Sequence, residues 1–175
     1  MDDSAATSLN PTAASLLGFL HRGPMTGWDL VGAAEKGLGN FWNITRSQVY
    51  RELRLLDERG LIESGTVGPR DRRPFTITQA GRDAFGDWIS RSPAQEVIRF
   101  PLLLTVFFAE HVDPQRLERF LRLHQLEHQE KLEAYERLEE RIGADQSGPA
   151  LALRFGLEYE RAVLRWFGSL PWLAK

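Results

Sequence analysis

The stretch that decides the fold runs from Thr45 to Thr78. It reads TRSQVYRELRLLDERGL (45–61), then IESGTVG (62–68), then a basic tip PRDRRP (69–74) and FTIT (75–78). The first part predicts a helix, and the remainder predicts a β-hairpin with arginines at its tip. A helix followed at once by such a hairpin is typical of a winged helix-turn-helix, a unit that binds DNA.

The helix at 45–61 has two different faces. Thr45 and Gln48 have the spacing of a capping box, so the helix begins after Thr45. Val49, Leu53 and Leu56 follow at steps of four and three, which predicts one narrow buried seam. The opposite face carries hydroxyl and guanidinium donors suited to phosphates and to base edges in the major groove. These are Arg46, Ser47, Tyr50, Arg51 and Arg54.

The predicted hairpin adds a second basic element. Leu61–Val67 is expected to form one strand, and Phe75 and Ile77 alternate in the return strand. The tip between them contains Arg70, Arg72 and Arg73. Residues 45–82 contain eight arginines and five acidic residues, a local charge of +3; because the whole chain has a formal charge of -2, the remainder carries about -5. Any affinity for DNA must therefore come from the positive charge of this stretch and not from the chain as a whole.

The flanking sequence predicts the supporting helices. A first helix is expected from Asn10-Pro11 to about His21, and a second one is capped by Thr26 and Asp29, with Trp28, Leu30 and Val31 facing inward. A fourth helix is expected to begin at Thr78 and Gly81, to run through Phe85, Trp88 and Ile89, and to end at Ser92-Pro93. The Ser92-Pro93 break is the expected domain boundary.

Beyond Pro93 the sequence predicts helices alone. An apolar helix begins at Pro101, a long charged helix follows, and a last helix ends before Pro171. The expected fold is mainly α with a small β-hairpin wing: a winged helix-turn-helix over 9–92 and an α-helical dimerisation and possible effector domain over 93–175. The long helix has a heptad seam formed by Leu117, Leu121, His124, His128, Lys131, Tyr135, Leu138 and Ile142.

Several classes of function are excluded or disfavoured by what the sequence lacks. It contains no cysteine, which excludes disulfides, thiolate metal sites and cysteine nucleophiles. No apolar run approaches the roughly 20 residues of a membrane span, and the start MDDSAATS is not a signal peptide, so we expect a cytoplasmic protein. Glycine-rich phosphate loops, GxSxG and HExxH are also missing, so we expect neither an enzyme nor a cofactor.

Three segments resemble the PadR family of bacterial transcriptional regulators. They are GWDL (27–30), SQVYRELRLLDERGLIE (47–63) and RRPFTITQAGRDAFGDWI (72–89), in this order and at the separations expected for the family. The resemblance covers about residues 9–89, and the helices after Pro93 are similar to those of the longer-tailed members.

This resemblance implies a homodimeric regulator, usually a repressor, whose C-terminal helices embrace the partner subunit. It also implies that a small molecule or a stress signal relieves DNA binding. Trp28 and Phe75 stand where the family very often has Tyr, and Arg51 stands where many members have Pro. The family's DNA-contact positions correspond to Ser47, Gln48, Tyr50 and Arg51 on the helix and to Arg72 and Arg73 in the wing.

Two groups in the chain allow more than one interpretation. His124 and His128 lie four residues apart, a spacing at which two imidazoles can share a metal ion, but only Glu127 stands nearby as a third ligand. We favour packing or a hydrogen-bonded dimer seam for this pair. Aromatic side chains could line an effector pocket between subunits, although core packing explains most of them. The candidates are Trp42, Trp88, Phe107, Tyr159 and Trp166.

The sequence leaves two alternatives to an effector-relieved repressor of DNA. One is a protein-interaction scaffold in which the winged helix contacts another protein. The other is a metal-responsive regulator that uses His124 and His128.

Overall fold

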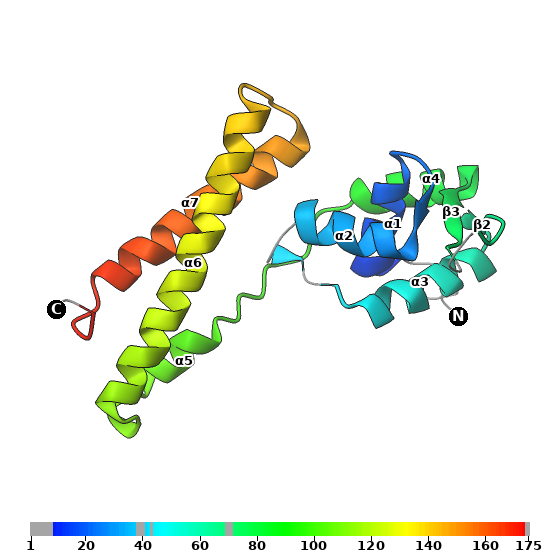
Figure 1. Ribbon diagram of the computed structural model, residues 1–175. Helices are drawn as coiled ribbons and strands as arrows, with labels where there is room; N and C mark the ends of the chain where they lie inside the picture. The colour runs from blue at the N-terminus through cyan, green and yellow to red at the C-terminus, as the bar shows by residue number, and fades with distance from the viewer. Residues whose placement is uncertain (1–8, 38–40, 43, 69–71, 174–175) are drawn as a thin grey trace. The chain divides into compact units, whose positions relative to one another are not determined.

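The computed structural model describes residues 9–37, 41–42, 44–68 and 72–173 (Figure 1). The chain divides into two compact units, residues 1–94 and residues 95–175. Each unit has a hydrophobic core of its own.

The described residues of the first unit form the helices α1 (Pro11–Leu20), α2 (Gly27–Gly37), α3 (Arg46–Glu58) and α4 (Gln79–Ile89). All four were predicted, and their caps are confirmed. The Asn10 side chain accepts a hydrogen bond from the backbone N–H of Ala13 at 2.8 Å and so begins α1. At α2, the Asp29 carboxylate accepts from the backbone N–H of Thr26 at 3.0 Å, and Thr26 Oγ1 accepts in return from the backbone N–H of Asp29 at 3.2 Å.

The core of the first unit lies between α1, α2 and α3. The predicted seam of Val49, Leu53 and Leu56 is confirmed, since all three residues are at most 1% exposed. The inward orientation of Trp28 is wrong, because this residue is 58% exposed while Leu30 on the same helix is fully buried. Trp28 lies in the first turn of α2, and its indole ring contacts Arg46 of α3 outside the core.

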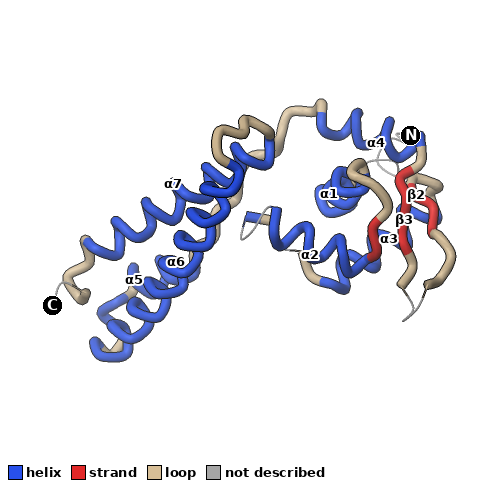
Figure 2. Tube along the Cα trace, turned by 45° about the horizontal axis from the view of Figure 1, so that its top comes forward, coloured by secondary structure: helices blue, strands red, loops and turns tan. Residues whose placement is uncertain are grey.

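The wing is a three-stranded antiparallel sheet with the order β1-β3-β2 (Figure 2). Its strands are β1 (Met25–Thr26), β2 (Ile62–Ser64) and β3 (Pro74–Ile77). The predicted hairpin is confirmed, although β2 is shorter than expected. Beyond the ladder the hairpin continues through a hydrogen bond from Gly68 N to Arg72 O at 2.8 Å. The strand β1 was not predicted, and it joins the start of α2 directly to the wing.

One residue, Thr78, fixes the angle between the wing and α4. Its hydroxyl donates to Gly60 O at 2.8 Å and accepts from the backbone N–H of Gly81 at 3.1 Å. The backbones approach so closely here that a Cβ atom on Gly81 would lie 2.0 Å from Leu61 O. Glycine is therefore required at position 81.

The second unit contains α5 (Pro101–Phe107), a single 3-10 turn η3 (Ala109–His111), α6 (Pro114–Ile142) and α7 (Gly148–Gly168). The long helices α6 and α7 lie side by side (Figure 1). A cluster at one end of this pair joins Leu102 of α5 to Leu117 and Leu121 of α6 and Phe167 of α7.

The heptad seam of α6 packs against the same chain. All eight of its residues are buried or partly buried, with Leu117, Leu121 and His128 the most enclosed. Opposite His128, α7 places Glu160, which is 0% exposed, and His128 Nδ1 lies 2.5 Å from Glu160 Oε2. The buried polar residue of the seam, His128, therefore has its hydrogen-bond partner within the same chain.

Candidate DNA interface

The start of α3 is fixed by the predicted capping box. Thr45 Oγ1 accepts from the backbone N–H of Gln48 at 3.3 Å, and Gln48 Oε1 accepts from the backbone N–H of Thr45 at 2.9 Å. The side-chain oxygen of Gln48, a predicted DNA-contact residue, is therefore occupied by the helix itself. This box orients the first turn of α3, which carries Arg46 and Ser47.

The predicted DNA-facing side of α3 is exposed to solvent. The structure places the guanidinium and hydroxyl groups of this side opposite the buried seam, so the helix anchors on one face and presents donors on the other. The exposed residues of this face are Arg46, Ser47, Tyr50, Arg51 and Arg54.

The N-terminus of α2 adds an aromatic side chain that the sequence interpretation missed. The Arg46 guanidinium carbon lies 4.6 Å from the centre of a Trp28 ring, a cation–π contact. Beside it, a Cβ atom on Gly27 would lie 2.6 Å from the Tyr50 ring, so a larger residue at position 27 would require the ring to move. The GWDL motif, Gly27 to Leu30, therefore supports α3 as well as α2. In the sequence, the signal for this role was a tryptophan, Trp28, directly before the capping residue Asp29.

A buried carboxylate lies next to Arg51. Glu52 is 3% exposed, and its Oε1 accepts from Arg51 Nε at 3.2 Å and from Arg51 Nη2 at 2.9 Å. Its Oε2 accepts from Asn10 Nδ2 at 2.9 Å. Neither Glu52 nor Asn10 was among the predicted site residues, because an acidic residue within an amphipathic helix normally indicates solvent.

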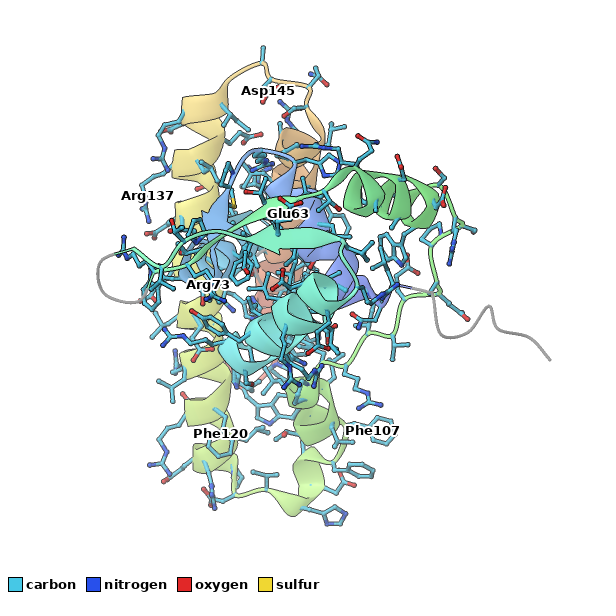
Figure 3. All side chains as sticks on the ribbon, turned by 90° about the vertical axis from the view of Figure 1, so that its right-hand side faces the viewer. Glu63, Arg73, Phe107, Phe120, Arg137 and Asp145 are labelled. Carbon is cyan, nitrogen blue, oxygen red and sulfur yellow. The ribbon has the colours of Figure 1, made fainter. Side chains whose placement is uncertain are left out.

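The wing supplies the second group of cations. Arg72 and Arg73 are exposed, and Figure 3 shows α3 beside the hairpin, with Arg73 toward its tip. Arg70 lies outside the described residues. The Thr26 side chain and backbone hold the pKa of Asp29 below its ordinary value through hydrogen bonds, and the positive charge of Arg72 adds to this effect. The positive charge of Arg72 in the wing thus favours the ionised form of Asp29 at the start of α2.

The predicted effector residues are divided between the units. Trp42 and Trp88 pack against the core of the first unit, and the indole N–H of Trp42 is buried without a hydrogen-bond partner among the described residues. In the second unit, Trp166 makes an edge contact with the Phe100 ring, and its ring is tilted against that of Phe167. Phe107 is 77% exposed. Burial raises the pKa of Tyr159, and the nearby charge of Glu160 raises it further.

The two histidines of α6 have different partners. His124 is partly exposed, and its Nδ1 lies 3.5 Å from Glu127 Oε2, whereas His128 is buried against Glu160. Within the described part of the chain, no group of three or more His, Asp or Glu side chains is placed to share a metal ion. Among the same residues, no helix is long and apolar enough to cross a membrane.

A helix-turn-helix with a cationic exposed face on its second helix, flanked by a small sheet with arginines near its tip, defines a winged helix-turn-helix DNA-binding protein. Residues 16–87 match the model of the family described as "Transcriptional regulator PadR-like family", and residues 98–169 match "Virulence activator alpha C-term". The chain is a PadR-like DNA-binding transcriptional regulator of the longer type, and not an enzyme.

Known relatives are similar over nearly the whole chain. The negative transcriptional regulator PadR of Bacillus subtilis (strain 168) is 26% identical over 169 residues, which cover 89% of this chain and 93% of the relative. The crystal structure of Bacillus subtilis PadR in complex with operator DNA has a TM-score of 0.76 and 25% identity, covering 91% of this chain and 96% of the other. The complex of the same protein with p-coumaric acid has a TM-score of 0.69 and 27% identity, covering 90% and 94%.

Proposed function

We propose that this chain is a homodimeric repressor that binds a pseudo-palindromic operator through α3 and the wing and is released by a small-molecule effector. The observation that carries the proposal is the exposed arginine face of α3, anchored by a fully buried seam. The negative regulator from Bacillus subtilis and its operator complex support the same direction of regulation. Binding to chromosomal DNA implies a cytoplasmic location.

The proposed dimer rests on apolar side chains that the second unit leaves exposed. Leu104 and Phe107 of α5 are 65% and 77% exposed, and Leu123 and Leu126 of α6 are 60% and 61% exposed. Phe155 of α7 is 62% exposed. Exposed apolar groups in such number mark interaction surfaces, and a second copy of these helices would cover them.

A dimer would space two copies of α3 for successive major grooves, about 34 Å apart, with each wing beside the backbone or the minor groove. Arginine contacts to phosphates release counterions, so the affinity is expected to fall steeply with salt. Arg46, Arg54, Arg72 and Arg73 are the proposed phosphate-directed cations, and Arg51 is the proposed base-directed one.

A small-molecule effector is proposed to release the repressor from its operator. Bacillus subtilis PadR binds p-coumaric acid, and aromatic side chains of this chain offer flat apolar walls to a ligand of that kind. The candidates are Phe107, Tyr159 and Trp166 in the second unit and Trp42 and Trp88 in the first. A ligand would act by favouring a dimer whose two α3 helices have the wrong separation. Titration of aromatic acids into the operator complex tests this step, and an operator affinity that ignores all of them contradicts it.

A mobility-shift experiment with DNA from upstream of the chain's own gene tests DNA recognition. Arg51→Ala is expected to weaken operator binding by roughly 1 to 3 kcal/mol if the side chain reads a base. Arg137→Ala is the matched control, because Arg137 lies on α6 and its ion pair with Glu133 at 3.7 Å is exposed. Equal operator affinity for wild type and Arg51→Ala would remove Arg51 from the interface.

The same experiment separates the other candidate functions. Absence of any salt-dependent shift on upstream DNA would favour a protein-interaction scaffold. Release of DNA by divalent metal ions, and its loss on His128 substitution, would favour a metal-responsive regulator.

A further inference from the structure

Helix α3 contains one carboxylate, that of Glu52, which is almost inaccessible to solvent. The Glu52 side chain is 4% exposed, while the neighbouring Arg51 side chain is 58% exposed. A buried carboxylate is unfavourable unless charged or hydrogen-bonding partners surround it. The partners of Glu52 therefore explain why the residue is tolerated at this position.

The two oxygens of Glu52 face different elements. Oε2 accepts from Asn10 Nδ2 at 2.9 Å, and Asn10 Oδ1 in turn accepts from the backbone N–H of Ala13 as the cap of α1. Oε1 accepts two hydrogen bonds from Arg51, at 3.2 Å from Nε and 2.9 Å from Nη2. The carboxylate is thus held from behind by α1 while it holds an exposed guanidinium in front.

This contact uses one edge of the guanidinium. A guanidinium has five N–H donors in a rigid plane, and Glu52 occupies the edge formed by Nε and one N–H of Nη2. The end formed by Nη1 and the second N–H of Nη2 is directed away from Glu52. These two parallel donors match the O6 and N7 acceptors of guanine in the major groove.

We propose that Glu52 is a positioning residue that fixes Arg51 for recognition of a guanine. Holding the side chain before DNA arrives reduces the rotamer freedom lost on binding. The negative charge of Glu52 also offsets the general attraction of Arg51 to phosphates. The binding energy of Arg51 then depends more strongly on a base whose acceptors match its two donors, as those of guanine do. Glu52 thereby raises the ratio of operator to non-specific affinity. This inference rests on the proposed contact of Arg51 with DNA.

The test is a double-mutant cycle between Glu52→Gln and Arg51→Ala in the full chain. Operator and scrambled DNA of equal length are titrated, and each guanine of the operator is replaced in turn. Glu52→Gln is expected to lower the operator-to-scrambled affinity ratio about tenfold, at the same base pair where Arg51→Ala loses discrimination. In the Arg51→Ala background, Glu52→Gln is expected to change the ratio less than twofold.

Asn10→Ser controls for a purely structural role. Serine still caps α1 but removes the hydrogen bond to Glu52 Oε2, so stability falls while the Arg51 contact stays. The affinity ratio of Asn10→Ser is expected to remain within twofold of wild type. If Glu52→Gln does not fold, Glu52→Asp replaces it, because the shorter side chain keeps the charge and withdraws from Arg51.

Three outcomes overturn the inference. They are an unchanged ratio in the Glu52 variant, an equal loss with and without Arg51, and a loss in Asn10→Ser as large as that in the Glu52 variant. If Arg51→Ala itself binds the operator like wild type, the proposed Arg51 contact fails. If Arg51→Ala weakens binding and Glu52→Gln leaves the ratio unchanged, only the positioning role fails.

Discussion

The buried pair of His128 and Glu160 gives the sharpest prediction about the second unit. Their side chains are 8% and 1% exposed, and the ring centres of Phe100 and Phe167 lie 6.0 and 5.9 Å from that of His128. Glu160 Oε1 is already buried without a hydrogen-bond partner among the described residues. The pair is therefore enclosed by apolar groups, and water cannot easily replace a partner that is removed.

Removal of one partner should be more harmful than removal of both. His128→Leu leaves the Glu160 carboxylate without its partner, which is expected to reduce the free energy of unfolding by about 3 to 5 kcal/mol. Glu160→Leu leaves a buried imidazole nitrogen unsatisfied, and the expected loss is about 1 to 3 kcal/mol. The double leucine variant replaces the polar pair by apolar groups and is expected to lie within about 1 kcal/mol of wild type or to be more stable.

Amide hydrogen exchange across α6 and α7 during urea titration measures these values locally, since the two units need not unfold together. His124→Leu is the control, because the His124 ring is partly exposed and has a solvent-exposed contact with Glu127 at 3.5 Å; its expected effect is below about 1 kcal/mol. Two results would contradict a buried, mutually dependent pair: a loss of stability in the double variant equal to the sum of the two single losses, or a loss in His128→Leu no larger than that in His124→Leu.

Further predictions concern the first unit. Hydrogen bonds from Thr26 lower the pKa of Asp29, so the stability that its carboxylate contributes should be present above the ordinary pKa of an unfolded aspartate and lost as the pH falls through the lower folded value. The thermal midpoints of wild type and Asp29→Asn should therefore differ at pH 7 and converge in acid. Gly81→Ala should lose about 1 to 3 kcal/mol of stability by urea denaturation, whereas Gly86→Ala on the same helix, where a Cβ meets nothing within 4 Å, should not lose any. Gly27→Ala should displace the Tyr50 ring and weaken operator binding in a mobility shift, and unchanged affinity would exclude Tyr50 from the interface.

Local signals were sufficient to predict most of the first unit. Thr45 with Gln48 and Thr26 with Asp29 marked helix starts, and the spacing of Val49, Leu53 and Leu56 marked the buried seam. Such signals depend on neighbours within one or two turns, so they are legible without knowledge of the fold.

Features that depend on distant residues were missed. Strand β1 has two residues and exists through its pairing with β3, so it has no alternation of its own. The orientation of Trp28 depends on Arg46 of another helix. Buried Glu52 and Glu160 contradict the rule that acidic residues face solvent. Besides the neighbouring Arg51, Glu52 is held by Asn10, 42 residues away in the sequence, and Glu160 is held by His128, 32 residues away.

The most direct test of the account is a footprint of the purified full chain on DNA upstream of its own gene. We expect two protected, inverted half-sites whose centres are separated by about one helical turn, 10 to 10.5 base pairs, or a multiple of it. Protection should weaken with salt and be reduced by Arg51→Ala but not by Arg137→Ala. Protection that ignores the sequence, or a single half-site bound by a monomer, would contradict the proposed dimeric operator recognition.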